Sequence, residues 1–414
     1  MWRCYGVGVD PTHHEALAPP EAPIGLTDLG LVRVFRALAE FEQLTRSELV
    51  DHTGLARATV SSVIYELINS GLVREGAVTV PTRARSGRPP QLLSLEPDFA
   101  YAVGIDLAHD HVRAVLTDVV GTVRWDRTEQ MAVDDDPAGA LSLAERLIDA
   151  ALADVVVPRE KILGLGAGFA CPVDRDGRGL HAENIMHGWV GVRPVEELAE
   201  RTGLPVRIIN DANAGVLAER LYGAARGCDD VLYLRLSCGI GAGAICDGRM
   251  LLGHRGIAGE LGHVVVDRHG LQCRCGNRGC LETIASPPAI ADLLTRSWRR
   301  PVVSADLPDL LHRGDRSAAR AVEDAGEAVG QALATAVMLL NPRLIVVGGD
   351  LAAAGDTLLE PMRRTIARNT MHSHAESLTI VTSALGDSAG VRGAAALVLK
   401  NAPTALALAS RARP

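Results

Sequence analysis

Four residues have the types and the spacing of a metal site. Cys273, Cys275 and Cys280 lie within one short stretch, CRCGNRGC, and His263 precedes it by ten positions. Thiolate and imidazole are ligands that zinc favours, and four protein donors make a closed tetrahedral site of structural type. The alternative, three unrelated reduced cysteines, is disfavoured by the close spacing. Because a closed site has no free ligand position, its metal would hold a loop and would not activate water.

A second group of polar residues could bind a molecule that carries several hydroxyl groups. Carboxylates and amides satisfy neighbouring hydroxyls in pairs, as acceptors and donors. The candidate residues are Asn210, Asp211, Glu260, His263 and Glu282. His263 can serve both sites, with one ring nitrogen on the metal and the other on a hydroxyl. The alternative is that Asn210 and Asp211 only cap a helix starting at Ala212. We favour binding because the whole set occurs together.

Length and composition limit the class of protein. A chain of 414 residues is long enough for two or three domains. The net charge of −8 argues against a general nucleic-acid coat, although residues 45–95 carry six arginines against four acidic residues. The sequence shows neither an apolar run of 18 residues nor a secretion signal, and residues 1–25 are expected to form a flexible leader. We therefore expect a cytoplasmic protein with no membrane partner.

Residues 26–96 have the pattern of a winged helix-turn-helix domain. A first helix is expected over 26–41 from the spacing of its apolar residues. Thr45, with Glu48 three positions later, forms the capping box of a short second helix. Gly54 supplies a tight turn before a third helix. Two short helices around such a turn form a helix-turn-helix, whose second helix enters the DNA major groove.

The residues expected to contact DNA lie on the third helix and on a basic hairpin that follows it. They are Arg57, Ala58, Thr59, Ser61, Ser62, Arg83, Arg85 and Arg88. Arg57 could reach guanine edges or phosphate, and the hairpin arginines suit phosphates or a narrow minor groove. The helical pattern alone fits a packing or dimerising hairpin equally well, but the basic hairpin favours DNA. Ala56 is a departure, because a Ser or Thr cap normally precedes such a helix.

From Tyr101 onward strands alternate with helices, which indicates an α/β domain over 100–400. Two similar halves each open with a strand hairpin, so we expect two lobes around a cleft. The lobes are expected over about 100–225 with the C-terminal helix, and over about 226–385, followed by a tail of residues 401–414. Ligands of such sheets bind at the carboxyl ends of the strands, facing the cleft.

The large domain resembles the ROK family of repressors, open reading frames and sugar kinases. The stretches that carry the resemblance are GAGFACPVD at 166–174, ENIMHGW at 183–189, INDANAGVLAE at 209–219, CGIGAGAI at 238–245, GELGH at 259–263, CRCGNRGCLE at 273–282 and NPRLIVVGGD at 341–350. The set is specific, although each piece alone is not. The resemblance implies an α/β actin/hexokinase-like (ribonuclease H-like) two-lobed domain behind an α+β winged helix-turn-helix.

The resemblance also implies roles for individual residues. It assigns a structural zinc ion to the Cys/His group, and sugar binding to the polar group with Asn184 added. Asp211 takes the position of the general base in the family's kinases. Their Gly-Gly-Thr phosphate loop is replaced here by Ala108-His109-Asp110, whose side chains crowd the backbone amides and repel phosphate. Ser237-Cys238 likewise replaces Gly-Thr in a second loop. We therefore expect ATP binding to be lost, Asp211 to remain only a vestigial base that accepts a ligand hydrogen bond, and the protein not to be an enzyme.

Together these features predict a DNA-binding transcriptional regulator, a repressor of carbohydrate-related genes controlled by a sugar or sugar derivative. A homodimer or homotetramer is expected, because two-fold symmetry lets paired recognition helices meet the half-sites of double-stranded operator DNA. No dense cluster of basic residues accompanies the carboxylates, which favours a neutral sugar over a sugar phosphate. Two alternatives remain open: an active ATP-dependent sugar kinase with a DNA-binding domain, and a regulator gated by a protein partner.

Overall fold

The computed structural model describes residues 26–77, 91–183 and 185–411. The chain divides into two compact units, with boundaries between Ser94 and Leu95 and between Ala402 and Pro403. The predicted leader, the hairpin arginines Arg83, Arg85 and Arg88, and Asn184 lie outside the described residues.

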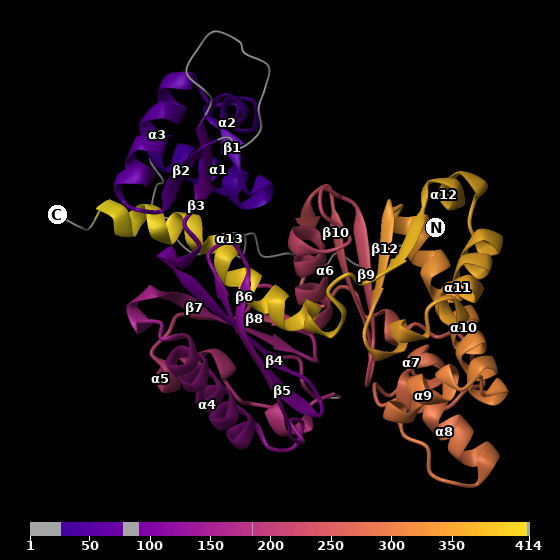
Figure 1. The fold of residues 1–414 in the computed structure, drawn as a ribbon. Coiled ribbons are helices and arrows are strands. Elements are labelled where there is room, and N and C mark those ends of the chain that lie inside the picture. The colour runs from indigo at the N-terminus through magenta and orange to yellow at the C-terminus, as the bar shows by residue number, and fades with distance from the viewer. Residues whose placement is uncertain (1–25, 78–90, 184, 412–414) are drawn as a thin grey trace, which may run out of the picture. The chain divides into compact units, whose positions relative to one another are not determined.

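Among its described residues, the smaller unit contains helices α1 to α3, the end of α13 from Pro403, and a sheet with the strand order β1-β3-β2 (Figure 1). Its elements are α1 Leu26–Phe41, β1 Leu44–Thr45, α2 Arg46–Thr53, α3 Arg57–Asn69, β2 Val73–Ala77 and β3 Gln91–Leu95. The predicted capping box is confirmed, since Thr45 and Glu48 each bind the other's backbone N–H. Gly54 ends α2 with a positive φ of 66°, a conformation that glycine adopts without strain.

The first lobe of the larger unit is built on a five-stranded mixed sheet, with the order β6-β5-β4-β7-β8. Its strands are β4 Tyr101–Leu107, β5 His111–Asp118, β6 Val123–Gln130, β7 Ile162–Phe169 and β8 Val206–Asn210. β4, β5 and β6 pair antiparallel, whereas β4, β7 and β8 pair parallel. The carboxyl ends of β4, β7 and β8 therefore meet at one edge, where Leu107 pairs with Phe169 and Phe169 with Asn210.

The second lobe repeats this topology with the order β11-β10-β9-β12-β13. Its strands are β9 Val231–Leu236, β10 Ile240–Cys246, β11 Arg249–Met250, β12 Leu344–Gly348 and β13 Thr379–Thr382. β9, β10 and β11 are antiparallel, and β9, β12 and β13 are parallel. The predicted two-lobed α/β fold, in which each half opens with a hairpin, is confirmed.

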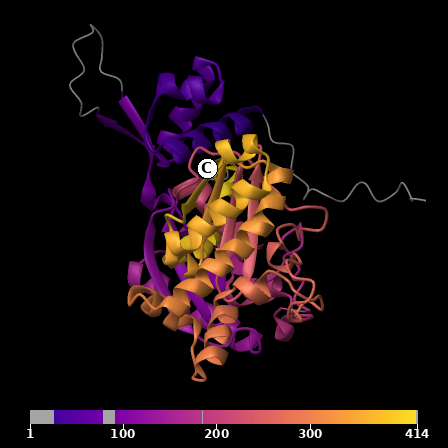
Figure 2. The same ribbon diagram turned by 90° about the vertical axis from the view of Figure 1, so that its right-hand side faces the viewer.

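Helices cover both sheets. They are α4 Pro137–Val155, α5 Pro194–Thr202, α6 Asp211–Tyr222, α7 Glu282–Ala285, α8 Pro287–Trp298, α9 Leu307–His312, α10 Arg316–Leu340, α11 Asp356–Asn369, α12 His372–Ser377 and α13 Ala389–Arg411. α4 and α5 share one hydrophobic core with the first sheet, and α7 to α11 share another with the second sheet. Figure 2 shows α10 and α11 side by side in the second lobe.

The other face of each sheet is covered by one helix, α6 or α13. α6 packs on the second sheet, and α13 packs on the first. The close approach of α13 requires glycine in the sheet, since a Cβ at Gly166 would lie 1.9 Å from the carbonyl oxygen of Ala394. α13 also continues through residues 401–411, which we expected to form a tail. These residues are rich in alanine and leucine, which are strong helix formers.

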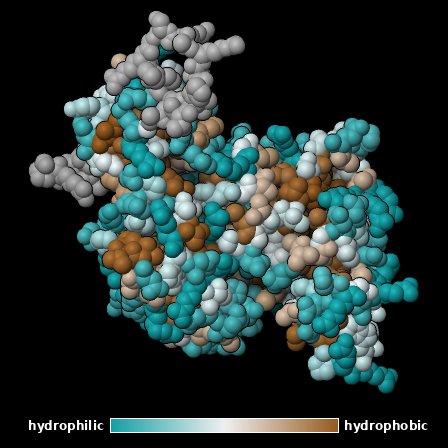
Figure 3. All heavy atoms as spheres, in the orientation of Figure 1, coloured by the Kyte–Doolittle hydropathy of each residue, from teal (hydrophilic) through white to brown (hydrophobic). Residues whose placement is uncertain are grey.

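Hydrophilic residues cover most of the coloured surface in Figure 3, with hydrophobic residues between them in small groups. Of the helices within the described residues, none has the length and apolar character needed to span a bilayer.

Candidate functional site

A large cleft opens in the larger unit, and both lobes line it. Its volume is about 1,200 Å³. The first lobe contributes residues at the carboxyl ends of β7 and β8 and the turn after β4, and the second lobe contributes residues near β9, β10 and β12. Asn210, Asp211, Glu260, His263 and Glu282 all line this cleft. The polar residues selected from the sequence therefore come together in space, apart from Asn184, which is not described.

Asn210 and Asp211 stand where β8 ends and α6 begins. The Asn210 side-chain oxygen accepts hydrogen bonds from the N–H groups of Ala212 and Asn213, at 3.0 and 3.1 Å. Its amide nitrogen donates to the Cys171 carbonyl oxygen, at 3.2 Å, and to Asp211 Oδ1, at 3.1 Å. These four bonds use the full capacity of a primary amide. The predicted capping role is thus present, and a ligand would have to replace one of these bonds to contact Asn210.

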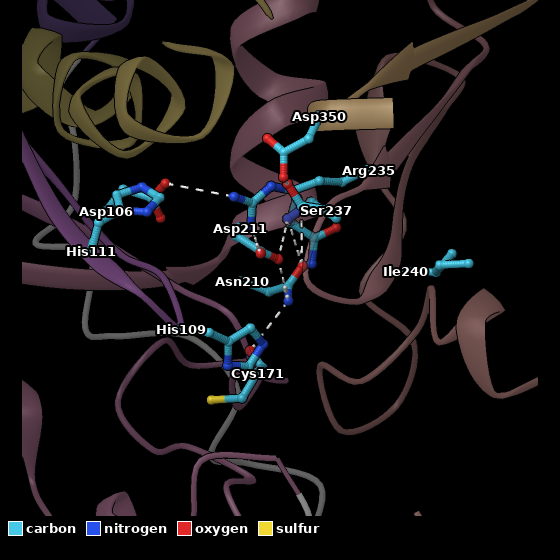
Figure 4. Close-up of polar contacts among 12 residues, drawn as sticks. Asp106, His109, His111, Cys171, Asn210, Asp211, Arg235, Ser237, Ile240 and Asp350 are labelled. Atoms are coloured by element: carbon cyan, nitrogen blue, oxygen red, sulfur yellow. Dashed lines mark hydrogen bonds and ion pairs between the residues drawn. The ribbon is translucent and has the colours of Figure 1, made fainter. Parts of the chain in front are cut away.

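Arg235, on β9 in the second lobe, reaches two buried carboxylates of the first lobe (Figure 4). It forms an ion pair with Asp211 and lies 4.0 Å from Asp106 Oδ2. Asp106 is 2% exposed, and its Oδ1 has no hydrogen-bond partner among the described residues. Burial raises the pKa of Asp106. Burial also lowers the pKa of Arg235, but the adjacent Asp211 and Asp106 outweigh it and raise that pKa above its usual value.

The side chains of the turn that follows β4 pair with neighbouring ionisable groups. His109 Nδ1 lies 2.9 Å from both carboxylate oxygens of Asp134, and His111 Nδ1 lies 2.7 Å from Asp110 Oδ1. The hydrogen bond from His111 lowers the pKa of Asp110. The backbone N–H of Ala108 donates to the His111 carbonyl oxygen, at 3.2 Å, and is thus already used within the turn.

Glu282 opens α7 and is held from two directions. Arg274 Nε donates to Oε1 at 2.9 Å, and Arg274 Nη2 donates to Oε2 at 3.2 Å. The backbone N–H of Ile240 donates to Oε2 at 3.0 Å. Gly239 permits this approach, because a Cβ there would lie 2.7 Å from Glu282 Oε2. Glu282 therefore connects the cysteine-rich loop to the glycine-rich turn between β9 and β10.

Glu260 lies beside these groups with its carboxylate in the cleft. Burial, reinforced by the charges of Asp211 and Glu282, raises the pKa of Glu260 to about 7, although Arg274 acts in the opposite direction. Its Oε2 lies 3.8 Å from His263 Nε2. Glu260 can therefore gain or lose a proton near neutral pH, and can act as a hydrogen-bond donor or acceptor toward a ligand.

The four Cys/His residues converge as predicted. One ligand atom from each of His263, Cys273, Cys275 and Cys280 lies within 4.8 Å of every other. The Cys273 Sγ to His263 Nδ1 and the Cys275 Sγ to Cys280 Sγ distances are both 3.6 Å. Tetrahedral coordination with metal–sulfur and metal–nitrogen bonds of about 2.3 and 2.1 Å would separate such donors by roughly 3.6–3.8 Å. The geometry fits a tetrahedral metal ion, and His263 turns Nδ1 toward it.

The third helix of the smaller unit presents most of its predicted contact residues to solvent. Arg57, Ala58, Ser61 and Ser62 are exposed, whereas Thr59 is half-buried. No side-chain cap bond forms at Ala56 in the described structure, as its sequence position predicted.

Sequence reasoning did not select Arg235 and Arg274, which line the cleft, or Asp134, which contacts His109. Arg235 carries a weak signal, since it is a lone charge in the apolar strand VLYLRL. Arg274 lies between two cysteines and was hidden by the metal motif, and Asp134 had no distinguishing pattern. Their importance depends on partners that are distant in sequence.

These features define a class of protein: a helix-turn-helix unit joined to an actin/hexokinase-like domain with a polar cleft. Residues 102–401 match the model of the ROK family, and residues 31–76 match the model of the IclR helix-turn-helix domain. The chain therefore belongs to the ROK family.

The relatives include regulators and kinases. A xylose repressor from Caldicellulosiruptor bescii is 29% identical over 390 residues, which cover 91% of this chain and 96% of that protein. A glucokinase from Thermotoga maritima is 33% identical over 311 residues, which cover 72% of this chain and 96% of that protein. The crystal structure of a ROK family transcriptional regulator, a homologue of the Escherichia coli MLC protein, has a TM-score of 0.76 and 26% identity, and covers 93% and 98% of the two chains.

Proposed function

We propose that this chain is a DNA-binding transcriptional repressor of carbohydrate-related genes, whose affinity for DNA depends on a sugar in the cleft. The observation that carries the proposal is the combination, in one chain, of an exposed recognition helix with a cleft where carboxylates converge. The xylose repressor and the structurally similar regulator align with about nine tenths of this chain. The glucokinase aligns with 72%. Similarity to the regulators thus extends over more of the chain.

The DNA contacts are assigned to α3. Arg57 would contact a base edge or a phosphate, and Ser61 and Ser62 would position the helix on the backbone. Ala58, the half-buried Thr59 and the three hairpin arginines complete the proposed surface. The protein would act as a homodimer or homotetramer, so that paired α3 helices meet two half-sites of double-stranded operator DNA.

The cleft would bind a neutral sugar without phosphorylating it. Asp211 accepts hydrogen bonds from Ala212, Asn210 and Arg235, so its carboxylate is committed to protein partners. Arg113, Arg235 and Arg274 line the cleft, and each is paired with a carboxylate, which leaves their charges less available to a phosphate. Asp211, Glu260, His263, Glu282, Asn210 and Asn184 form the proposed sugar-binding set.

The metal at the Cys/His site would be zinc in a structural role. Three thiolates and one imidazole suit zinc, and four protein ligands close the coordination shell. The ion would hold the loop that presents His263 and Glu282 to the cleft. The same loop carries Arg274, so the metal and the sugar would be bound by one folded segment.

Sugar binding would control DNA affinity by favouring one arrangement of the two lobes. A ligand shifts such an equilibrium only if it binds one state more tightly, and typical coupling changes affinity 5- to about 150-fold. Arg235, which lines the cleft, connects β9 of the second sheet with Asp106 of the first sheet and with Asp211, a member of the proposed sugar-binding set.

A thermal-shift screen of neutral hexoses, pentoses and N-acetylhexosamines tests the proposed effector. A sugar at 100 times its dissociation constant should stabilise the protein by about 2.7 kcal/mol. We expect one sugar to raise the melting temperature of the wild type and not of Glu260→Gln. If every sugar leaves the melting temperature unchanged, the proposed effector class is wrong.

Sugar kinase activity is the second candidate, which the 33% identity to the glucokinase favours. A coupled ATP-consumption assay with the sugar that binds distinguishes the two. We expect no sugar-dependent turnover above the rate of Asp211→Asn. Robust turnover that Asp211→Asn abolishes would make the protein a kinase.

A further inference from the structure

Arg274 links the proposed metal site to the cleft. Its backbone lies between Cys273 and Cys275, so the metal ligands fix the position from which its side chain extends. The guanidinium binds Glu282 side-on, at 2.9 and 3.2 Å. Paired hydrogen bonds of this kind fix orientation as well as distance. The placement of Glu282 in the cleft is thereby tied to the fold of the cysteine-rich loop.

Glu282 passes this constraint on to the turn between β9 and β10. Its Oε2 accepts from the Ile240 N–H at 3.0 Å, and the Glu282 side chain is 11% exposed. A Cβ at Gly239 would lie 2.7 Å from Glu282 Oε2 and 2.9 Å from Arg274 Nη2. Arg274, Glu282 and the turn are therefore in close contact at Gly239, and a shift of Arg274 removes the paired hydrogen bonds that orient the Glu282 carboxylate.

We propose that Arg274 is the positioning residue that couples metal binding to effector binding. The inference rests on the proposed function, because the effector is taken to be a neutral sugar held partly by Glu282. With metal bound, Arg274 holds the Glu282 carboxylate against Ile240 and toward the ligand. Without metal, the loop releases Arg274 and the carboxylate loses its orientation. Coupling is reciprocal, so the sugar must also strengthen metal binding by the same factor.

The chain offers a matched control in Arg278. This arginine belongs to the same loop, but its guanidinium donates to the carbonyl oxygen of Gly270, at 3.0 Å, on the loop itself. Arg274→Met and Arg278→Met remove the same charge from the same segment. Only Arg274→Met breaks the contact with Glu282, and Arg274→Lys retains a donor that can reach one of its oxygens.

Hydrogen exchange tests the first half of the coupling without any sugar. Full-length protein is compared with and without bound metal, and exchange is followed in the peptide that contains Ile240. We expect metal removal to speed exchange of this amide at least tenfold in the wild type and in Arg278→Met. Metal-loaded Arg274→Met should already exchange rapidly, with partial protection in Arg274→Lys. If metal-loaded Arg274→Met is protected like the wild type, the proposal is wrong.

Metal affinity tests the second half. The dissociation constant of the metal is measured at equilibrium by competition with a colorimetric chelating indicator, with and without the sugar that raises the melting temperature in the thermal-shift screen, such as D-xylose or D-glucose. We expect the sugar to strengthen metal binding at least fivefold in the wild type and Arg278→Met, and less than twofold in Arg274→Met. Sugar binding with unchanged metal affinity in the wild type refutes the coupling alone. If no sugar of the screen binds, the proposed effector and the coupling to it both fail.

Discussion

Replacing Arg235 by methionine should strongly destabilise the larger unit. The substitution retains an apolar stem and leaves Asp106 and Asp211 without their cation, at 2% and 8% exposure. Breaking a buried ion pair by removing one partner costs about 3–5 kcal/mol. The Arg235 side chain is 18% exposed at the cleft, so water can partly replace it. We therefore expect a loss of about 3 kcal/mol in the free energy of unfolding at pH 8.

The loss should depend on pH with a definite sign. Burial raises the pKa of Asp106 in the folded protein, so the folded state binds a proton at Asp106 more tightly than the unfolded state does. The stability from such a group is complete below its unfolded pKa and is lost as pH rises through its folded pKa. Without Arg235 this pKa should rise further, because the opposing positive charge is gone. The deficit of Arg235→Met should therefore be smaller at pH 5 than at pH 8.

Urea unfolding followed by tryptophan fluorescence measures this effect, because three of the four tryptophans, Trp125, Trp189 and Trp298, belong to the larger unit. With typical slopes of about 1–3 kcal/mol per molar urea, the midpoint should fall by roughly 1 M or more. Asp106→Asn in the Arg235→Met background removes one stranded charge and should recover part of the loss. A deficit below about 1 kcal/mol at pH 8, or no recovery in the double variant, would refute the ion-pair argument.

Three further outcomes are expected. Ala56→Ser should supply the missing cap of α3 and stabilise the smaller unit by about 0.5–2 kcal/mol, measured by thermal unfolding; an unchanged melting temperature would contradict this. Glu260 has a raised pKa of about 7, so its contribution to stability should be complete below pH 4.5 and fall as pH rises through 7, and Glu260→Gln should flatten that part of the stability profile. Arg57→Ala should weaken specific DNA binding by about 1–3 kcal/mol in anisotropy titrations if it contacts a base, whereas an equal loss on random DNA would assign it to a phosphate.

Local features of the fold were predictable because their causes are local. Thr45 and Glu48 are three positions apart, which determines a capping box without help from the rest of the chain. The repeated hairpins likewise indicated two lobes before their sheets were seen. Residues 401–411, expected as a tail, extend α13 instead, and their alanine and leucine content favours the helix.

The sequence allowed most residues of the site to be selected, but not the contacts that these residues make with one another. The polar and Cys/His groups could be selected from their types and spacing. Arg235 acts through Asp106, which lies on another sheet, and no sequence pattern specifies that pairing. Arg274 similarly gains its role from the buried Glu282 and the turn at Ile240. The alternative considered for Asn210, that it caps a helix, is observed in the structure. Its side-chain oxygen caps α6, and its amide nitrogen bonds to Cys171 and Asp211, so all four hydrogen-bonding positions of the amide are occupied.

The central claim is that a sugar bound in the cleft changes the affinity with which α3 binds DNA. Its most direct test uses DNA fragments selected from the source genome by the purified protein, titrated by fluorescence anisotropy with and without the sugar that binds. The account predicts specific binding in the absence of sugar and at least a fivefold weaker affinity at saturating sugar, with no such change in a variant whose cleft no longer binds it. Equal affinity in both conditions would contradict the account.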